Sequence, residues 1–265
     1  MDTGKQVWKD IEKIREQKPL IHNITNYVVM NNTANALLAL GASPVMAHAI
    51  EELDEMIRMA GALVLNIGTL DNQWISAMYE ALNAAREYST PIVLDPVGAG
   101  ATKLRTKTVT HLMDKKRPDI VCGNGSEIIA LAGNEHQTKG VDSISSSDDA
   151  VDAAGIIAKK YETTVIITGK TDHIVSEDRY MKIHNGVEMM GRITGMGCTS
   201  SALAGAFLGV NEFSFDAAVS TMVCLDVAGE IAAEKAAGPG SLQMHILDAL
   251  YNLDEQSILD KIRIE

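Results

Sequence analysis

Short apolar runs alternate with longer amphipathic segments along most of the chain, and this alternation restricts the folds that it can adopt. Four runs are brief, rich in β-branched residues and bounded by Gly, Pro or Asn, as buried strands are: Ala62–Ile67, Pro91–Asp95, Asp119–Val121 and Thr164–Thr168. Three segments carry apolar residues at helical spacing: Asn72–Tyr88, Lys103–Lys115 and Ser147–Tyr161. Strands that alternate with helices predict an α/β fold with a mostly parallel central sheet flanked by helices on both faces.

Two stretches depart from this alternation. Asp172–His184 has two β-rich arms on either side of Glu177-Asp178, which predicts a hairpin. Cys198–Gly209 and Phe213–Lys235 form a long Ala-rich helical pair whose small residues permit close packing. The chain has no Gly/Ser-rich or Pro-rich linker, no low-complexity tract and no clear internal repeat. We therefore expect residues 1–265 to form one domain.

The charge and the cysteines argue against several classes of protein. The net charge of −12 disfavours a surface for nucleic acid or for an anionic membrane, because phosphate groups attract basic faces. No apolar run approaches the roughly 18–20 residues that cross a bilayer, and the first residues lack a signal-peptide pattern. Cys122, Cys198 and Cys224 are sparse and form no CxxC pair, which indicates a reducing compartment. We expect a cytoplasmic protein without a nucleic-acid or membrane partner.

Glycine-bearing turns follow the predicted strands. Ligands of open α/β sheets bind beyond the carboxyl ends of the strands, where glycine allows the backbone to approach a ligand closely. The turns that follow successive strands and the hairpin are Asp95–Gly100, Cys122–Glu127, Thr168–Thr171 and Gly191–Cys198. We therefore expect the ligand site at this edge of the sheet.

The last of these turns carries the strongest signal for an anion. Gly195-Met196-Gly197-Cys198 leads straight into a predicted helix, and free backbone N–H groups at a helix N-terminus bind anions. A glycine turn used only for packing is the alternative, and a single G-x-G motif does not decide between the two. Asp95 and Glu127 stand in neighbouring turns; taken singly, the first starts a turn and the second caps a helix. Taken together with the anion site, the two carboxylates favour phosphoryl transfer with Mg²⁺.

Two common nucleotide-binding motifs are absent. Gly169-Lys170-Thr171 looks like the end of a P-loop, but the first glycine of that motif would fall at Thr164. The dinucleotide fingerprint G-x-G-x-x-G also fails, because its last glycine would fall at Ser200. A nucleotide must therefore be held by a different arrangement.

Cys198 lies where the predicted helix begins, a position that tends to lower the pKa of a thiol. An inert buried thiol is the alternative. None of the seven histidines forms a recognisable partner motif for a nucleophilic cysteine. A positioning or proton-accepting role is therefore favoured over covalent catalysis.

Four segments together resemble the hydroxyethylthiazole kinase family: Pro19–Ala47, Leu94–Thr102, Gly123–Ile128 and Thr194–Cys198. The similarity extends from about Pro19 to Gly209. It implies a ribokinase-like fold, Mg²⁺ with ATP as the phosphoryl donor, and phosphorylation of the alcohol of 4-methyl-5-(2-hydroxyethyl)thiazole in thiamine biosynthesis and salvage. It also implies a homotrimer with active sites at the subunit interfaces.

The same resemblance implies roles for residues of the substrate and catalytic sites. Met46 matches the residue that packs on the thiazole ring, and Gly195 matches a substrate-contacting glycine. Asn26 resembles a polar group of the same pocket, supplied at the subunit interface. Gly197 and Cys198 fall at the catalytic turn, where most ribokinase-like kinases carry an aspartate base in place of Cys198.

For the nucleotide, the resemblance implies contacts at Thr168 and at Asn124. Asp95 and Glu127 match acidic residues near the metal and the phosphates, and are therefore expected both to bind the nucleotide and to hold Mg²⁺. One nucleotide-binding position departs from the family pattern. Cys122 stands where the family usually has Arg, whose guanidinium would pair with ATP phosphates.

The departure leaves the source of positive charge open, with Lys170, Lys103 and Arg192 as the candidates. It also keeps open a catalytically silent regulator that binds a nucleotide or a thiazole. Two enzymes with the same architecture are further alternatives. One is a hydroxymethylpyrimidine kinase, although Cys198 and the segment Asn23–Asn35 favour the thiazole enzyme. The other is a nucleotide-dependent hydrate dehydratase.

Overall fold

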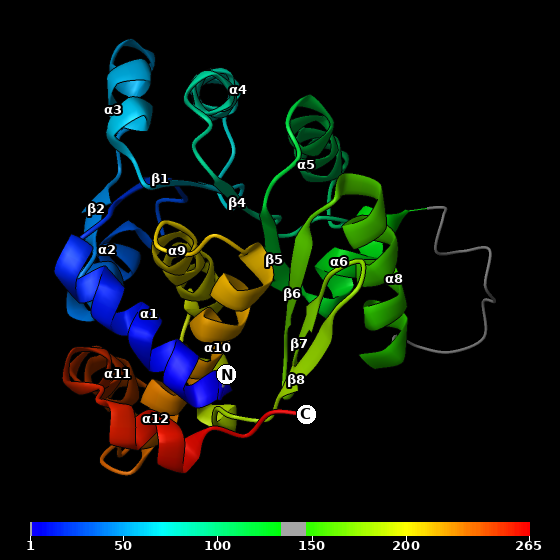
Figure 1. Cartoon of the computed structure of the whole chain (residues 1–265). Helices are drawn as coiled ribbons and strands as arrows, with labels where there is room; N and C mark the ends of the chain where they lie inside the picture. Colours follow the sequence, from blue (N-terminus) through cyan, green and yellow to red (C-terminus); the bar gives the residue numbers. More distant parts are fainter. Residues whose placement is uncertain (1, 134–146) are drawn as a thin grey trace.

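An eight-stranded sheet runs through the centre of the structure, and helices cover it on two sides (Figure 1). The computed structural model describes residues 2–133 and 147–265. The strands are β1 (Leu20–Ile24), β2 (Ser43–Val45), β3 (Ala62–Asn66), β4 (Ile92–Asp95), β5 (Ile120–Asn124), β6 (Thr164–Thr168), β7 (Asp172–Val175) and β8 (Tyr180–Ile183). Their order is β2-β1-β3-β4-β5-β6-β7-β8. Neighbours from β2 to β6 are parallel, whereas β7 and β8 add an antiparallel hairpin at the edge.

The helices form two layers. One face carries α3 (Leu53–Met59), α4 (Asn72–Tyr88), α5 (Lys103–Lys115), α6 (Gly125–Ala132) and α8 (Ser147–Tyr161). The other carries α1 (Thr3–Gln17), α2 (Met30–Leu40), α9 (Met196–Leu208), α10 (Ser214–Ala233), α11 (Pro239–Asn252) and α12 (Glu255–Lys261). Two short 3₁₀ turns are η1 (Ile50–Glu52) and η2 (Glu188–Arg192). Within the described residues, no helix combines the length and apolarity that crossing a membrane requires.

The pleat of each central strand supplies both layers with core residues. Along β3, Ala62 and Val64 face the α9 layer, whereas Leu63 and Leu65 face the α4 layer. Because successive side chains of a strand point to opposite faces, a strand covered on both sides must be apolar at every position. This requirement explains the unbroken apolar runs of the sequence.

Helix α9 lies directly against the middle of the sheet, in contact with β1, β3, β4 and β5. Gly205 makes this approach possible. A Cβ atom there would lie 2.6 Å from Val64 Cγ2 and 2.9 Å from Ile21 Cγ2. The small residues of α9 therefore serve close packing, and they set the position of its N-terminus relative to the strand ends.

The mostly parallel sheet, the terminal hairpin and the Ala-rich helical pair confirm the predictions from the sequence. Helices α4, α5 and α8 have the predicted bounds, and α9 begins two residues earlier than predicted, at Met196. Two strands were not predicted. Strand β1 contains the buried polar residues His22 and Asn23, and β2 is a three-residue edge strand that includes Pro44. Neither has the apolar run by which the other parallel strands were found.

Candidate active site

The carboxyl ends of the parallel strands lie side by side at one edge of the sheet. Asn66 pairs in register with Asp95 between β3 and β4, and Asn124 pairs with Thr168 between β5 and β6. The glycine-bearing turns after β4, β5 and β6 therefore meet at this edge, as the alternation of strands and helices predicts.

A chain of buried hydrogen bonds connects the loop after β1 to the first turn of α9. Asn26 Nδ2 donates to Asn66 Oδ1 at 2.8 Å and to Cys198 Sγ at 3.4 Å. Asn66 Nδ2 donates to Asp95 Oδ2 at 2.6 Å, and Ser201 Oγ donates to the same oxygen at 2.8 Å. The chain therefore links three neighbouring strand ends to the helix that carries Cys198.

Burial dominates the electrostatics of these side chains. It raises the pKa of Asp95 to about 7; the Glu127 charge adds to the rise, and hydrogen bonds from Ser201 and Asn66 oppose it. Burial, followed by the charge of Asp95, also raises the pKa of Cys198 to about 12. The expected lowering of this thiol pKa at the helix N-terminus is therefore wrong. Desolvation and the neighbouring carboxylate outweigh the helix dipole, and Cys198 is a thiol at neutral pH.

Glu127 forms hydrogen bonds with two turns of the site. Its Oε2 accepts a hydrogen bond from the backbone N–H of Asn124 at 2.9 Å, and Asn124 Oδ1 accepts one from the Glu127 N–H at 3.1 Å. This capping box begins α6. Glu127 Oε1 accepts a further hydrogen bond from the N–H of Gly98, at 2.8 Å, in the turn after β4. The capping interpretation is thus confirmed, and the same carboxylate lies near enough to Asp95 to raise its pKa.

The N-terminus of α9 presents unpaired backbone N–H groups. The first helical bond runs from the N–H of Thr199 to the carbonyl of Gly195 at 2.8 Å, so the N–H groups of the three residues between them precede the ladder. Gly195 turns the chain into the helix with φ +83°, and a Cβ atom there would lie 2.5 Å from Val29 Cγ1. Only glycine suits this junction, which can receive an anion.

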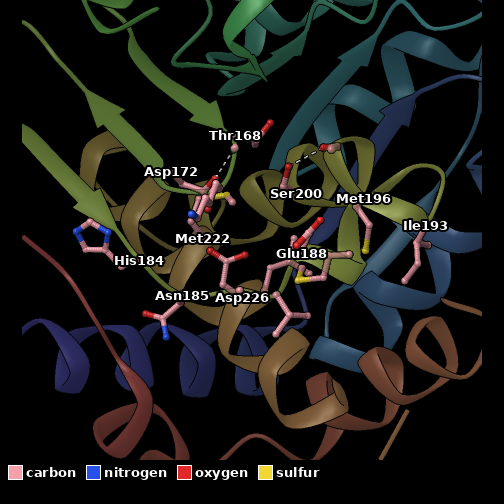
Figure 2. A pocket seen from close by; sticks show the side chains of 18 of the residues that line it. Thr168, Asp172, His184, Asn185, Glu188, Ile193, Met196, Ser200, Met222 and Asp226 are labelled. Carbon is pink, nitrogen blue, oxygen red and sulfur yellow. Dashed lines mark hydrogen bonds between the residues drawn. The ribbon is translucent and has the colours of Figure 1, made fainter. Parts of the chain in front are cut away.

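A cavity of about 920 Å³ opens beside this helix end (Figure 2). Its lining includes Gly195, Gly197 and Ser200 at the start of α9, and Thr168 at the end of β6. It continues to α10, where Met222, Leu225 and Asp226 face it. A second hollow of about 530 Å³ shares Thr168, Gly169 and Lys170 with it. The cavity therefore offers an anion site at α9 and a partly apolar region against α10.

The position at which the family usually has arginine lies beneath this cavity. Cys122 is 1 % exposed, and its Sγ lies 3.4 Å from Ser200 Oγ, on the far side of a residue that lines the cavity. Burial raises the pKa of this thiol to about 12. Of the three cations considered as replacements, Lys170 lines the cavity, whereas Lys103 and Arg192 do not.

Two loops carry the residues expected to bind the substrate, and Trp74 contacts both loops. Its Nε1–H donates to the carbonyl of Thr25 at 2.7 Å, next to Asn26 in the chain. The Trp74 ring packs against Tyr27, with centroids 4.7 Å apart, and against His48 at 4.0 Å, two residues beyond Met46. Trp74 therefore fixes the loop after β1 relative to the loop after β2.

Buried His22 forms a hydrogen bond with the loop after β2. Burial lowers its pKa, so the ring is neutral at neutral pH. Its Nε2 lies 2.8 Å from the carbonyl of Ala47, which requires the proton on Nε2. This bond anchors the residue that follows Met46.

Three residues of the site were not singled out from the sequence. Asn66 is the last residue of β3, and a polar residue within that otherwise apolar run was the signal available in the sequence. Ser201 stands three residues after Cys198, which places both on one side of α9. Trp74 is one apolar residue among many in a helix, and only the fold shows that it touches two loops. The expected residues Asn26, Asp95 and Cys198 do come together.

Comparison with solved structures defines the class of the fold. A ribokinase-like superfamily protein from Enterococcus faecalis V583 superposes with a TM-score of 0.62 at 11% identity, covering 87% of this chain and 86% of that one. This likeness shows the fold alone. The chain has the ribokinase-like fold, with the N-terminus of α9 at the carboxyl edge of its sheet.

Closer relatives identify the family. The sequence model of the hydroxyethylthiazole kinase family matches residues 11–256. A hydroxyethylthiazole kinase from Aliivibrio fischeri (strain ATCC 700601 / ES114) is 53% identical over 251 residues, covering 95% of this chain and 93% of the relative. The structure of hydroxyethylthiazole kinase from Pyrococcus horikoshii OT3 superposes with a TM-score of 0.91 at 44% identity and covers 98% of both chains. The chain belongs to the hydroxyethylthiazole kinase family.

Replacing Gly195 with Ala will damage the anion site. The new Cβ meets Val29 and the backbone must leave φ +83°, a strain of about 1–3 kcal/mol. We expect affinity for a non-hydrolysable ATP analogue to fall at least tenfold in calorimetry. Gly155→Ala is the control, because a Cβ atom there meets nothing within 4 Å. Equal affinities for the Gly195→Ala variant and the unmodified protein would contradict the assignment.

Replacing Trp74 with Phe will loosen both substrate loops. The ring contacts survive in part, but the buried Thr25 carbonyl loses its donor, which costs about 1–3 kcal/mol. We expect the KM for the alcohol substrate to rise about threefold to tenfold while the KM for the nucleotide stays unchanged. Trp8→Phe is the control, since Trp8 is the other of the two tryptophans and lies on α1. A rise in both KM values would show general destabilisation instead.

Proposed function

We propose that this protein transfers the γ-phosphoryl group of ATP to the primary alcohol of 4-methyl-5-(2-hydroxyethyl)thiazole, as a step of thiamine biosynthesis and salvage. The observation that carries this proposal is the hydrogen-bonded chain from Asn26 to Cys198, which ends beside the anion site of α9. Membership of the hydroxyethylthiazole kinase family supports the same reaction. The transfer is direct, with the alcohol and the nucleotide bound at the same time.

The nucleotide occupies the cavity beside α9 in this proposal. Its terminal phosphates meet the N–H groups of the Gly195–Cys198 turn, a preorganised arrangement of donors for the charge of a transferring phosphoryl group. Thr168 and Lys170 line the cavity between that turn and α10. Lys170 then supplies positive charge in place of the arginine usual at position 122. Asn124 acts indirectly, through the capping box that holds Glu127.

The thiazole alcohol lies on the other side of the Gly195 turn. Asn26 is buried next to Cys198, and Met46 follows β2 at the same edge of the sheet. A methionine thioether is soft and adapts to a sulfur heterocycle. The alcohol oxygen is placed at Cys198, whose thiol points into the hydrogen-bonded chain.

Asp95 and Glu127 are the residues that fit Mg²⁺. Asp95 ends β4 and Glu127 lies in the first turn of α6, after the adjacent strand β5, and a cation would stabilise the buried charge of Asp95. Among the described residues, no group of three or more His, Cys, Asp or Glu side chains could hold a metal ion alone. The phosphates of ATP and water would supply further ligands. When bound, Mg²⁺ neutralises charge on the phosphates.

Cys198 has a positioning role in this mechanism. A loose phosphoryl-transfer transition state needs little deprotonation of the alcohol before transfer. A thiol with a pKa of about 12 is therefore compatible with the reaction, because an ionised base is not needed early. Gly197, exposed at the start of α9, leaves room for the reacting groups.

The reaction is tested by following ADP formation with the thiazole alcohol and identifying the phosphorylated product by mass spectrometry. Cys198→Ala should lower kcat about tenfold and leave both KM values within about twofold, since a positioned group of this kind contributes roughly 1–2 kcal/mol. Cys198→Ser is the matched variant and should keep more activity. An unchanged kcat in Cys198→Ala would remove this residue from the chemistry.

Three outcomes of the same assay distinguish the alternatives. Turnover with hydroxymethylpyrimidine but not with the thiazole would indicate the related kinase. Repair of hydrated NADH would indicate the dehydratase. Nucleotide binding without turnover of any acceptor would indicate the silent regulator.

Lys170→Met should raise the KM for ATP about threefold to tenfold, because it removes the cation that lines the cavity. The KM for the thiazole alcohol should not change. Lys103→Met is the matched control, since Lys103 begins α5 and lines neither cavity. An equal effect of the two substitutions would indicate general attraction between the protein and ATP instead of a local contact.

We also propose a homotrimer with active sites at the subunit interfaces. Large apolar side chains are exposed next to the proposed substrate loops: Tyr27 is 60% and Val28 65% exposed beside Asn26, and Ile50 is 48% exposed after Met46. A partner subunit at this face would cover them and enclose the thiazole. A monomer in sedimentation equilibrium would contradict this assembly.

Residues 1–265 act as one domain in this proposal, supported by the single sheet that both helical layers share. The cytoplasm is the proposed location, supported by three cysteines that are all unpaired. Small-molecule substrate and ATP are the proposed partners, without nucleic acid or membrane.

A further inference from the structure

Two buried carboxyl groups meet in the wall of the cavity, away from the N-terminus of α9. Asp172 begins β7 and Asp226 belongs to α10, and each is 4% exposed. Both line the cavity, and Figure 2 shows them near Met222 in the middle of the view, with Ser200 and Met196 to one side. Neither residue has a role in the reaction proposed above.

The two carboxyl groups differ in the hydrogen bonds that they accept. Asp172 Oδ1 accepts a hydrogen bond from the backbone N–H of Gly169 at 2.7 Å. Asp226 Oδ2 accepts none from any donor in the part of the chain that the structure describes. A buried acceptor without a donor costs free energy that a suitable ligand can recover.

The two carboxyl groups interact, and burial disfavours the charged form of each. Burial, and then the charge and hydrogen bond of Asp172, raises the pKa of Asp226 well above its ordinary value. Burial also raises the pKa of Asp172. A proton shared between the two groups would relieve their repulsion and would leave oxygen lone pairs that accept hydrogen bonds.

The surroundings of Asp226 suit the nucleoside half of a nucleotide. Met222 and Leu225 line the cavity from the same helix, and Met190 of η2 packs against α10 at Gly229. Methionine and leucine side chains form an apolar surface for a flat ring. A nucleotide whose phosphates lie at α9 extends into this region, so this step rests on the function proposed above.

We propose that Asp226 is a specificity-determining residue that accepts a hydrogen bond from an N–H or O–H donor of the nucleoside half of the phosphoryl donor. The exocyclic amino group of adenine and the ribose hydroxyls are the two sources of such a donor. Asp172 is the positioning residue, because Gly169 holds its carboxylate and it interacts with Asp226. A site built to hydrogen-bond one group rejects analogues that lack it, because its buried acceptor is then left unpaired.

The experiment compares four triphosphates as phosphoryl donors to the thiazole alcohol: ATP, purine riboside triphosphate, 2′-deoxy-ATP and 3′-deoxy-ATP. Asp226→Ala should raise the KM for ATP about tenfold, the ratio that about 1.4 kcal/mol produces. With the one analogue that lacks the recognised donor, Asp226→Ala and the unmodified protein should have the same KM. That analogue identifies the source as the amino group or as one of the hydroxyls.

Two further variants separate recognition from structure. Asp226→Asn should stay within about threefold for ATP, because its amide can donate to Asp172 while its carbonyl oxygen still accepts. Glu188→Gln is the control, as Glu188 also lines the cavity but is exposed, and it should change KM by less than twofold. Thermal unfolding establishes that each variant is folded. Asp226→Ala removes a buried carboxyl oxygen that has no hydrogen-bond donor among the described residues, so folding should persist.

The proposal is overturned if Asp226→Ala raises the KM equally for all four nucleotides, or for none of them. It is also overturned if Glu188→Gln matches Asp226→Ala. Failure of the proposed function has a different result: the unmodified protein then phosphorylates the thiazole with none of the four donors. In that case direct calorimetric binding of the same nucleotides gives the comparison, with the same pattern expected for the dissociation constants.

Discussion

The close contact between α9 and the sheet is the constraint on which the rest of the site depends. Gly205 lets the helix lie on β1 and β3, with no room for a side chain between them. Since the helix is rigid, this contact also determines where its N-terminus lies. The unpaired N–H groups of the Gly195–Cys198 turn are thereby held at the strand ends, beside the carboxylate of Asp95. The same packing contact therefore brings unpaired N–H groups and an acidic group together.

Burial gives the acids of this edge different properties. Asp95 receives hydrogen bonds from Asn66 and Ser201, yet desolvation still raises its pKa to about 7. Asp172 accepts a hydrogen bond from the backbone N–H of Gly169, Asp226 Oδ2 accepts none within the described residues, and burial raises the pKa of both carboxyl groups. The first environment suits a group that meets a cation, and the second suits an acceptor for a neutral donor. Both arise from the low polarity of a sheet that is covered on two faces.

Much of the fold could be predicted from the sequence, because a strand buried on both faces and an amphipathic helix leave different periodicities. The alternation of the two identified the parallel core from β3 to β6, and the β-rich arms around Glu177 identified the hairpin. Strands β1 and β2 were not predicted, because His22, Asn23 and Pro44 interrupt any apolar pattern. Of these residues, His22 supports the loop after β2 through its hydrogen bond to the carbonyl of Ala47.

The sequence by itself determined the class of fold, the family and the segments that surround the site, since motifs and periodicities are local properties of the chain. The tertiary structure alone decided the ionisation of Cys198, because the sequence shows the helix start but not the desolvation and the carboxylate that oppose its dipole. It also decided that Trp74 joins two loops, that Lys170 lines the cavity, and that Asp172 meets Asp226. These are contacts between residues distant along the chain, and no local pattern records the depth at which a side chain is buried.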